Sequence, residues 1–255
     1  MSSAYHIVIP ARMASERLPG KPLLSIAGRT MVEHVYRKAQ QSSAVSVVVA
    51  TDSHEIADAV QAFGGDAVMT SPAHTSGSDR LAECVNIKGW LNDAVVVNLQ
   101  GDEPLMPPAC LDQAAAILQQ NEDADVASLY WPIELPGDVD DPNVVKVVVG
   151  DSGQALYFSR SVIPYPRNTD ISTAMKAGRV WNRHIGLYAY RAGALRAFSS
   201  MQPSPLERLE KLEQLRFLEA GRSIVMQQAC QSIPAGVDTP EDLARVRALM
   251  ADDGI

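Results

Sequence analysis

The stretch HIVIPARMASERLPGKPL, residues 6–23, passes from a short apolar run into a loop rich in positive charge. Its first five residues have the β-branched, apolar composition of a buried strand. The loop that follows holds three cations, Arg12, Arg17 and Lys21, against one anion, in a chain whose formal net charge is -8. Anions bind at the carboxyl end of such a strand in open α/β sheets. The stretch therefore predicts an α/β fold that holds phosphates directly after its first strand.

Strand and helix patterns alternate regularly after this stretch. Strands that are apolar throughout are typical of a parallel sheet covered by helices on both faces. Helices are expected at 31–41, 53–63, 79–88 and 109–120, and further strands at 45–50, 67–69 and 94–99. We therefore predict a nucleotide-binding α/β part over residues 1–125, with a mostly parallel sheet flanked by helices.

The pattern changes after residue 125. Alternating or aromatic-rich segments predict strands at 126–133, 144–149, 155–159 and 185–190. The stretch 167–179 is polar without periodicity, which predicts a loop. Two amphipathic helices are expected, at 206–219 and 239–250. Residues 126–255 are thus predicted to form a smaller, mixed or antiparallel C-terminal lobe that is continuous with the first part.

Composition narrows the class of protein. Hydrophobic residues make up 46% and charged residues 20% of the chain, and no apolar run approaches the ~18 residues of a membrane span, so no membrane insertion is expected. Thirty acidic against 22 basic residues disfavour nucleic-acid binding. The N-terminus lacks the pattern of a secretory signal, which predicts a cytoplasmic protein. The cysteines, Cys84, Cys110 and Cys230, are odd in number and widely spaced, and are expected to be reduced core residues.

Small residues in the first loop favour close contact with a phosphate. Ala14, Ser15 and Gly20 allow backbone N–H groups to approach an anion, and Arg12 and Lys21 carry the charge to neutralise a triphosphate. Neither GxxxxGK[ST] nor GxGxxG occurs, which excludes the two commonest nucleotide motifs. A solvated loop without a ligand is the alternative interpretation.

Two aspartates are candidate ligands for a hard cation. Asp102 follows the apolar strand predicted at 94–99, and Mg²⁺ usually takes one or two protein carboxylates together with substrate phosphates. The alternative for Asp102 is a turn or helix N-cap before Pro104. Asp238 lies in GVDTPED, residues 236–242, which by itself indicates a helix N-cap with proline in the first turn.

Ten short motifs occur together and in a fixed order. They are IPAR, LPGKPL, VATD, HTSGSDRL, VVNLQGDEP, PNVVKVV, ALYFSRS, RHIGLYAYR, LEKLEQLR and GVDTPEDL, spread from about residue 7 to residue 247. In this combination the chain resembles the CMP-KDO synthetases, the 3-deoxy-manno-octulosonate cytidylyltransferases. The resemblance implies a fold of the nucleotide-diphospho-sugar transferase type and the transfer of CMP from CTP to the sugar acid KDO, with release of pyrophosphate, for lipopolysaccharide biosynthesis. It also implies a Mg²⁺ cofactor and a homodimer.

The same resemblance implies roles for individual residues. The CTP phosphates are expected on Arg12, Ser15 and Lys21, with Arg17 at the mouth of the loop, and the cytosine base is expected beside Ser78, Arg80 and Gln100. Asp102 and Asp238 are expected to hold Mg²⁺ and, with Lys21, to be catalytic. The KDO site is expected to include Arg160, His184, Tyr188, Glu210 and Gln214.

Other classes of protein fit the sequence less well. CMP-sialic acid synthetases share the implied fold but lack the LPGKPL form, and sugar-1-phosphate nucleotidylyltransferases favour a GxG[ST]R loop that is absent here. A catalytically silent nucleotide-binding protein on this scaffold is a further alternative. The presence of Lys21, Asp102 and Asp238 disfavours it. His184 taken alone is more typical of a hydrogen-bonded core histidine than of a ligand.

Overall fold

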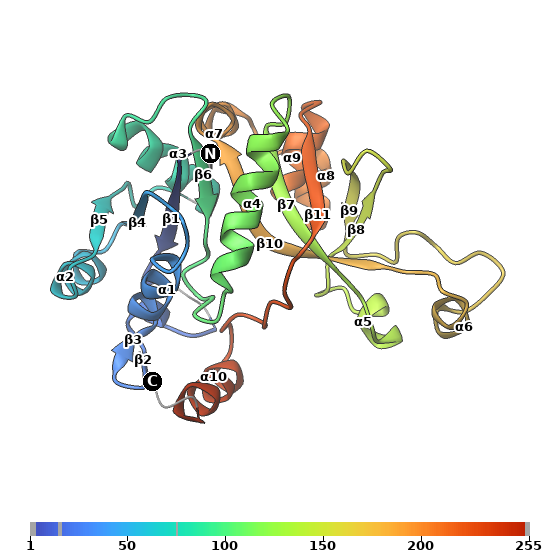
Figure 1. Cartoon of the computed structure of the whole chain (residues 1–255), viewed down its shortest axis with the longest axis horizontal. Coiled ribbons are helices and arrows are strands. Elements are labelled where there is room, and N and C mark those ends of the chain that lie inside the picture. Colours follow the sequence, from blue (N-terminus) through green and yellow to red (C-terminus); the bar gives the residue numbers. More distant parts are fainter. Residues whose placement is uncertain (1–3, 15–16, 75, 253–255) are drawn as a thin grey trace.

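One sheet with helices on both faces organises the chain in the computed structural model, which describes residues 4–14, 17–74 and 76–252 (Figure 1). Among these residues nine strands form the sheet, in the order β11-β7-β10-β6-β1-β4-β5, with β8 paired to β10 and β9 paired to β8. They are β1 (Tyr5–Ala11), β4 (Ser46–Thr51), β5 (Asp66–Met69), β6 (Val95–Asn98), β7 (Val126–Pro132), β8 (Lys146–Val149), β9 (Ala155–Ser159), β10 (Asn182–Arg191) and β11 (Ile224–Gln228). The expected α/β fold with a mostly parallel nucleotide-binding sheet is confirmed.

Helices and a small hairpin complete the described elements. The helices are η1 (Lys21–Leu23), α1 (Met31–Ala39), α2 (His54–Ala62), α3 (Gly77–Lys88), α4 (Pro108–Gln120), α5 (Pro136–Asp140), α6 (Ile171–Lys176), α7 (Ala192–Ser200), α8 (Pro205–Glu210), α9 (Gln214–Glu219) and α10 (Pro240–Asp252). The hairpin consists of β2 (Ser25–Ile26) and β3 (Arg29–Thr30).

The sheet separates two hydrophobic cores because its strands are apolar on both sides. In β1, Ile7 and Ile9 pack into the core formed with α1, α2, α4 and α10, whereas Val8 packs into the core formed with α3, α7 and α9. Val95, Val96 and Val97 of β6 alternate in the same way. Successive side chains of each strand point to opposite faces of the sheet, and both faces are apolar, as expected for a parallel sheet between two helical layers.

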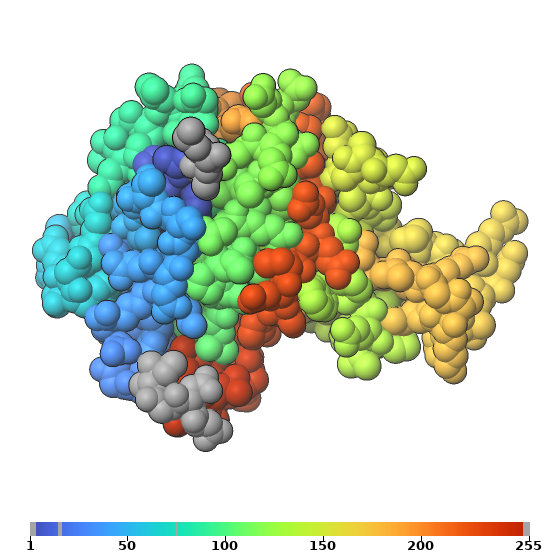
Figure 2. All heavy atoms as spheres, viewed as in Figure 1, coloured from blue at the N-terminus to red at the C-terminus, as the bar shows by residue number. Residues whose placement is uncertain are grey.

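The sheet continues across residue 125, where a change of pattern was predicted. β10 lies between β6 and β7 and runs antiparallel to both, while β11 runs parallel to β7. Strands from both halves of the sequence thus belong to one sheet. A separate small core, Ile133, Val139, Ala174 and Trp181, holds α5 and α6 together in the part that extends away from the body (Figure 2).

Three expectations from the sequence are wrong in detail. The stretch 167–179 contains the helix α6, because Asp170 accepts a hydrogen bond from the backbone N–H of Thr173 at the helix start. The expected helix at 206–219 is two helices, α8 and α9, because Lys211 adopts a left-handed conformation with φ 56. Cys230 is exposed, although its Sγ lies 3.8 Å from Sγ of buried Cys110. No helix among the described residues is long and apolar enough to cross a membrane.

The C-terminal helix returns to the N-terminal half of the sheet. α10 lies beside the β2–β3 hairpin, where Arg247 donates two hydrogen bonds to the carbonyl oxygen of Ser25 (Figure 1). Its N-terminus is capped by Thr239, whose Oγ1 accepts from the backbone N–H of Asp242 at 3.2 Å. Residue 238 is thereby held at the edge of the sheet where β1 and β6 end.

Candidate active site

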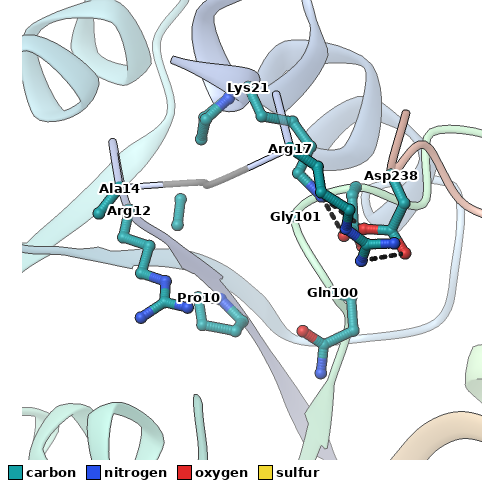
Figure 3. A pocket seen from close by; sticks show the side chains of 11 residues that line it. Pro10, Arg12, Ala14, Arg17, Lys21, Gln100, Gly101 and Asp238 are labelled. Carbon is teal, nitrogen blue, oxygen red and sulfur yellow. Dashed lines mark hydrogen bonds and ion pairs between the residues drawn. The ribbon is translucent and has the colours of Figure 1, made fainter. Parts of the chain in front are cut away.

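A cavity of about 630 Å³ lies at the carboxyl ends of the adjacent parallel strands β1 and β6 (Figure 3). This is the edge at which ligands bind in open α/β sheets. The cavity is lined by Pro10, Ala11, Arg12, Ala14, Arg17, Lys21, Pro22, Gln100, Gly101, Asp102 and Asp238. The first loop, the segment after β6 and the start of α10 thus meet in one place.

Tight backbone contacts bring Asp102 and Asp238 together. A Cβ atom at position 101 would lie 2.8 Å from the carbonyl oxygen of Pro10, so only glycine allows the chain after β6 to approach β1 this closely. The backbone N–H of Val237 donates to the carbonyl oxygen of Asp102 at 2.8 Å. This hydrogen bond joins the segment before α10 to the segment after β6. Asp102 and Asp238, which are far apart in sequence, therefore share a site.

Lys21 stands between the two carboxylates. Gly20 takes a left-handed conformation with φ 66 and starts the short helix η1, which points the Lys21 side chain into the cavity. Its Nζ donates to Oδ2 of Asp102 at 2.7 Å and to Oδ1 of Asp238 at 3.0 Å. Burial disfavours the charged ammonium, but the two carboxylates outweigh it and raise the pKa of Lys21. The lysine is therefore a cation at neutral pH.

The donor set fits a magnesium ion. Oxygens from Asp102 and Asp238 converge on one point, and Mg²⁺ usually takes one or two carboxylates and completes its shell with water and phosphate oxygens. No group of three or more His, Cys, Asp or Glu side chains suited to a metal occurs within residues 4–14, 17–74 and 76–252. Two carboxylates with phosphate oxygens and water are a donor set that Mg²⁺ commonly takes.

Glu103 adds a further carboxyl group beneath the site. Its Oε2 is buried and has no hydrogen-bond partner among the described residues. Burial, and then the charges of Asp102 and Asp238, raise the pKa of Glu103 to about 8. The residue is thus held largely neutral at pH 7, which avoids a third negative charge beside the two aspartates.

Two arginines complete the positive side of the cavity (Figure 3). Arg17 lies at the mouth, where its Nη2 is 3.2 Å from Oδ2 of Asp238. Arg12 lines the cavity, and its guanidinium makes no hydrogen bond or ion pair with any residue that the structure describes. A cation without a partner among the described residues of the cavity is suited to an anionic ligand. Ser15, which was also expected at the phosphates, lies outside the described residues.

A second cavity of about 360 Å³ adjoins the first, and Gln100 lines both. Most of its lining residues are polar or aromatic, and they come from α3, β6 and the segment after it, β10 and the α8–α9 region. They are Gly77, Ser78, Asn98, Gln100, Gly186, Tyr188, Tyr190, Lys211, Leu212, Glu213, Gln214 and Phe217. Of the residues expected to bind base or sugar, Ser78, Gln100, Tyr188 and Gln214 therefore line this cavity.

Glu213 and Ser78 join opposite walls of the second cavity. The Ser78 hydroxyl donates to Oε2 of Glu213 at 2.8 Å. Burial raises the pKa of Glu213 despite this hydrogen bond. The turn at Lys211, which ends α8, places both Lys211 and Glu213 at the cavity. In an unbroken helix over 206–219, Lys211 and Glu213 are two residues apart and would point to different faces.

Four residues expected to bind the base or the sugar take part in hydrogen-bonded networks: Arg80, Arg160, His184 and Glu210. Arg80 is buried and donates to Asp52 at 2.7 Å, so its guanidinium already has an anionic partner. Glu210 accepts from the Ser159 hydroxyl at 2.6 Å and from the backbone N–H of Arg160 at 2.9 Å. None of these residues is among those lining the two cavities.

The side chains of Arg160 and His184 are also engaged. Arg160 donates through Nε to the carbonyl oxygen of Glu210 and through Nη1 to that of Pro142. Nε2 of His184 lies 3.1 Å from Oγ of Ser128, and burial lowers the pKa of His184 to about 3. His184 is therefore neutral in the folded protein, and its ring packs 5.2 Å from that of Tyr188.

Sequence reasoning did not single out Glu103, which follows Asp102 of the first cavity, or Lys211 and Glu213 of the second. Glu103 follows Asp102 directly, and this position next to a proposed metal ligand was the signal available in the sequence. Lys211 and Glu213 lie in the segment predicted to be one helix, where they read as solvated helix residues. Only the break at Lys211 shows that they face the second cavity.

The fold and the carboxylate–cation cavity together define a nucleotidyltransferase. A family model described as cytidylyltransferase matches residues 6–224. Among curated relatives, the 3-deoxy-manno-octulosonate cytidylyltransferase of Xanthomonas campestris pv. campestris (strain B100) is 50% identical over 98% of this chain and 90% of its own length. The one from Cellvibrio japonicus (strain Ueda107) is 47% identical over 97% of this chain and 98% of its own length.

A solved structure agrees with these relatives. The structure of CMP:2-keto-3-deoxy-manno-octonic acid synthetase complexed with CTP superimposes with a TM-score of 0.90 at 43% identity, covering 98% of this chain and 100% of the other. The chain belongs to the 3-deoxy-manno-octulosonate cytidylyltransferase family.

Proposed function

We propose that this protein transfers CMP from CTP to KDO and releases pyrophosphate. The observation that carries the proposal is the convergence of Lys21, Asp102 and Asp238 in a cavity that adjoins a second, polar and aromatic cavity at Gln100. The relatives named as 3-deoxy-manno-octulosonate cytidylyltransferases and the CTP complex of a family member support the same reaction.

The first cavity is suited to the triphosphate. Arg12, which has no ion-pair partner among the described residues, can bind phosphate oxygens, and Lys21 lies close enough to neutralise charge that develops on the phosphoryl group. We infer that Asp102 and Asp238 hold Mg²⁺, which supplies Lewis-acid polarisation of the α-phosphate when bound. No residue needs to form a covalent intermediate, because phosphoryl transfer depends mainly on positioning and electrostatics.

The second cavity is suited to cytosine and the sugar acid. Gln100 and Ser78 offer donors and acceptors to a base, although the Ser78 hydroxyl is already engaged by Glu213. Tyr188 and Gln214 offer hydrogen bonds to sugar hydroxyls, and Lys211 is a cation at the same wall for a sugar carboxylate. Arg160, His184 and Glu210 then act by holding this wall in place through the contacts described above.

The choice of sugar acid distinguishes the proposed activity from that of a CMP-sialic acid synthetase. With CTP and Mg²⁺ present, we expect pyrophosphate release with KDO at a kcat/KM at least about 100-fold above that with N-acetylneuraminate, because a site built for one set of hydroxyls leaves groups unpaired with another. Comparable kcat/KM values for the two sugar acids would contradict the assignment of KDO.

We also propose that the protein is a homodimer. Three large apolar side chains are exposed in or next to the part that contains α5 and α6: Leu135, Tyr165 and Val180. A cavity of about 420 Å³ between α5 and α6 lies beside Tyr165. Exposed apolar groups on one part of a surface are typical of an interface.

Sedimentation velocity should give twice the chain mass of 27.5 kDa, and Tyr165→Glu should shift the protein toward the monomer. A monomeric wild-type chain at micromolar concentration would overturn this proposal.

A further inference from the structure

The ammonium group of Lys21 occupies the point on which the two aspartates converge. Nζ lies 2.7 Å from Oδ2 of Asp102 and 3.0 Å from Oδ1 of Asp238, and the lysine side chain is only 14% exposed. Asp102 makes no second ion pair among the described residues, whereas Asp238 keeps Arg17 on its other oxygen. Lys21 is thus the one described cation that compensates Asp102.

A divalent ion and this ammonium compete for the same two oxygens. Mg²⁺ binds carboxylate oxygens at about 2.1 Å, so an ion shared by these two oxygens would lie close to Nζ, and the two cations would repel each other. We therefore expect metal binding to displace Lys21 from at least one aspartate. The flexible stem of lysine allows such a move within the cavity.

We propose that Lys21 closes the divalent-cation site until the nucleotide's phosphates draw it away, so that metal and nucleotide enter together. This inference rests on the proposed metal site at Asp102 and Asp238. A triphosphate bound near Arg12 offers Lys21 a more highly charged partner in the same cavity. Asp238 stays paired with Arg17 after this exchange, but Asp102 is left without a cation until the metal binds. Phosphate binding therefore leaves the negative charge of Asp102 available to a divalent ion.

The exchange predicts reciprocal coupling between the two ligands. If CTP strengthens metal binding, the metal must strengthen CTP binding by the same factor. Lys21 would be the residue through which much of this coupling passes. A variant without the ammonium should bind metal well without nucleotide and gain less from adding it.

The test measures Mn²⁺ binding to the full-length protein by electron paramagnetic resonance of the free ion, without KDO, so that no turnover occurs. Lys21→Met is the main variant. Arg12→Met is the matched control, because it removes one positive charge from the same cavity without touching either aspartate. Lys21→Arg keeps a cation at position 21 and guards against an effect of altered packing. Circular dichroism checks that each variant is folded.

Without nucleotide, we expect Lys21→Met to bind Mn²⁺ about tenfold or more tightly than wild type, with Arg12→Met and Lys21→Arg within about threefold of wild type. Adding CTP should strengthen binding to wild type far more than to Lys21→Met. Equal affinities of Lys21→Met and Arg12→Met, or no binding to Lys21→Met, would overturn the inference. A failure of the proposed reaction is distinguishable, since it would appear as absent CMP transfer by wild type with CTP, KDO and Mg²⁺.

Discussion

We expect Asp102→Asn to lower kcat for CMP transfer by about a thousandfold or more while the protein stays folded. Asparagine keeps the shape of the side chain and an oxygen for Lys21 Nζ, but removes the charge that holds a divalent ion. The loss of charge stabilisation at the α-phosphate is worth several kcal/mol, and about 1.4 kcal/mol corresponds to a factor of ten in rate. Steady-state pyrophosphate release at saturating CTP and KDO measures the effect.

The control for this variant is Asp66→Asn. Asp66 is also paired with a lysine, since Lys88 Nζ lies 2.6 Å from its Oδ2, but it lies at the start of β5 away from both cavities. Its replacement should leave kcat within about twofold, as expected for an exposed ion pair. Near-wild-type activity of Asp102→Asn would remove Asp102 from the catalytic site.

Arg216→Met should destabilise the fold more than any other single change proposed here, by about 3 to 5 kcal/mol. Arg216 donates through Nε to Oε2 of Glu207 at 2.7 Å and through Nη2 to Oε1, and both side chains are nearly buried. Its guanidinium also lies 4.0 Å from the ring centroid of Phe198. Removing the arginine leaves the Glu207 carboxylate buried without its partner. Urea denaturation followed by circular dichroism measures the free energy of unfolding.

Two comparisons test the cause of this loss. The double variant Arg216→Met with Glu207→Met should recover much of the stability, because no unpaired charge then remains buried. Arg222→Met breaks the more exposed pair with Asp125 and should cost no more than about 1 kcal/mol. If Arg216→Met cost no more than Arg222→Met, the buried pair would not be what holds α8 to α9.

The parallel part of the fold was predictable because each strand carries its own signal. Ile7, Val8 and Ile9 are all apolar, which indicates burial on both faces, and the helices between such strands have ordinary periodicity. The place of β10 was not predictable, since its antiparallel pairing with β6 depends on contacts across the sheet. β11 has only a short apolar run, Ile224, Val225 and Met226, which was not recognised as a strand that pairs with β7.

The phosphate end of the site was easier to predict than the sugar end. Arg12 follows β1 directly and Asp102 lies in the segment after β6, so their position at the edge of the sheet was predictable from sequence. Asp238 required the resemblance, because only the contact between Val237 and Asp102 brings it there. Glu213 was missed because Lys211, in a left-handed conformation, ends α8 and changes the direction of the chain before α9.

The most direct test of the central claim measures pyrophosphate release from CTP, UTP, ATP and GTP, each with and without KDO, and with Mg²⁺ present or chelated. We expect release only when CTP, KDO and Mg²⁺ are all present. Release from CTP without KDO, equal use of UTP, or full activity after chelation would contradict it.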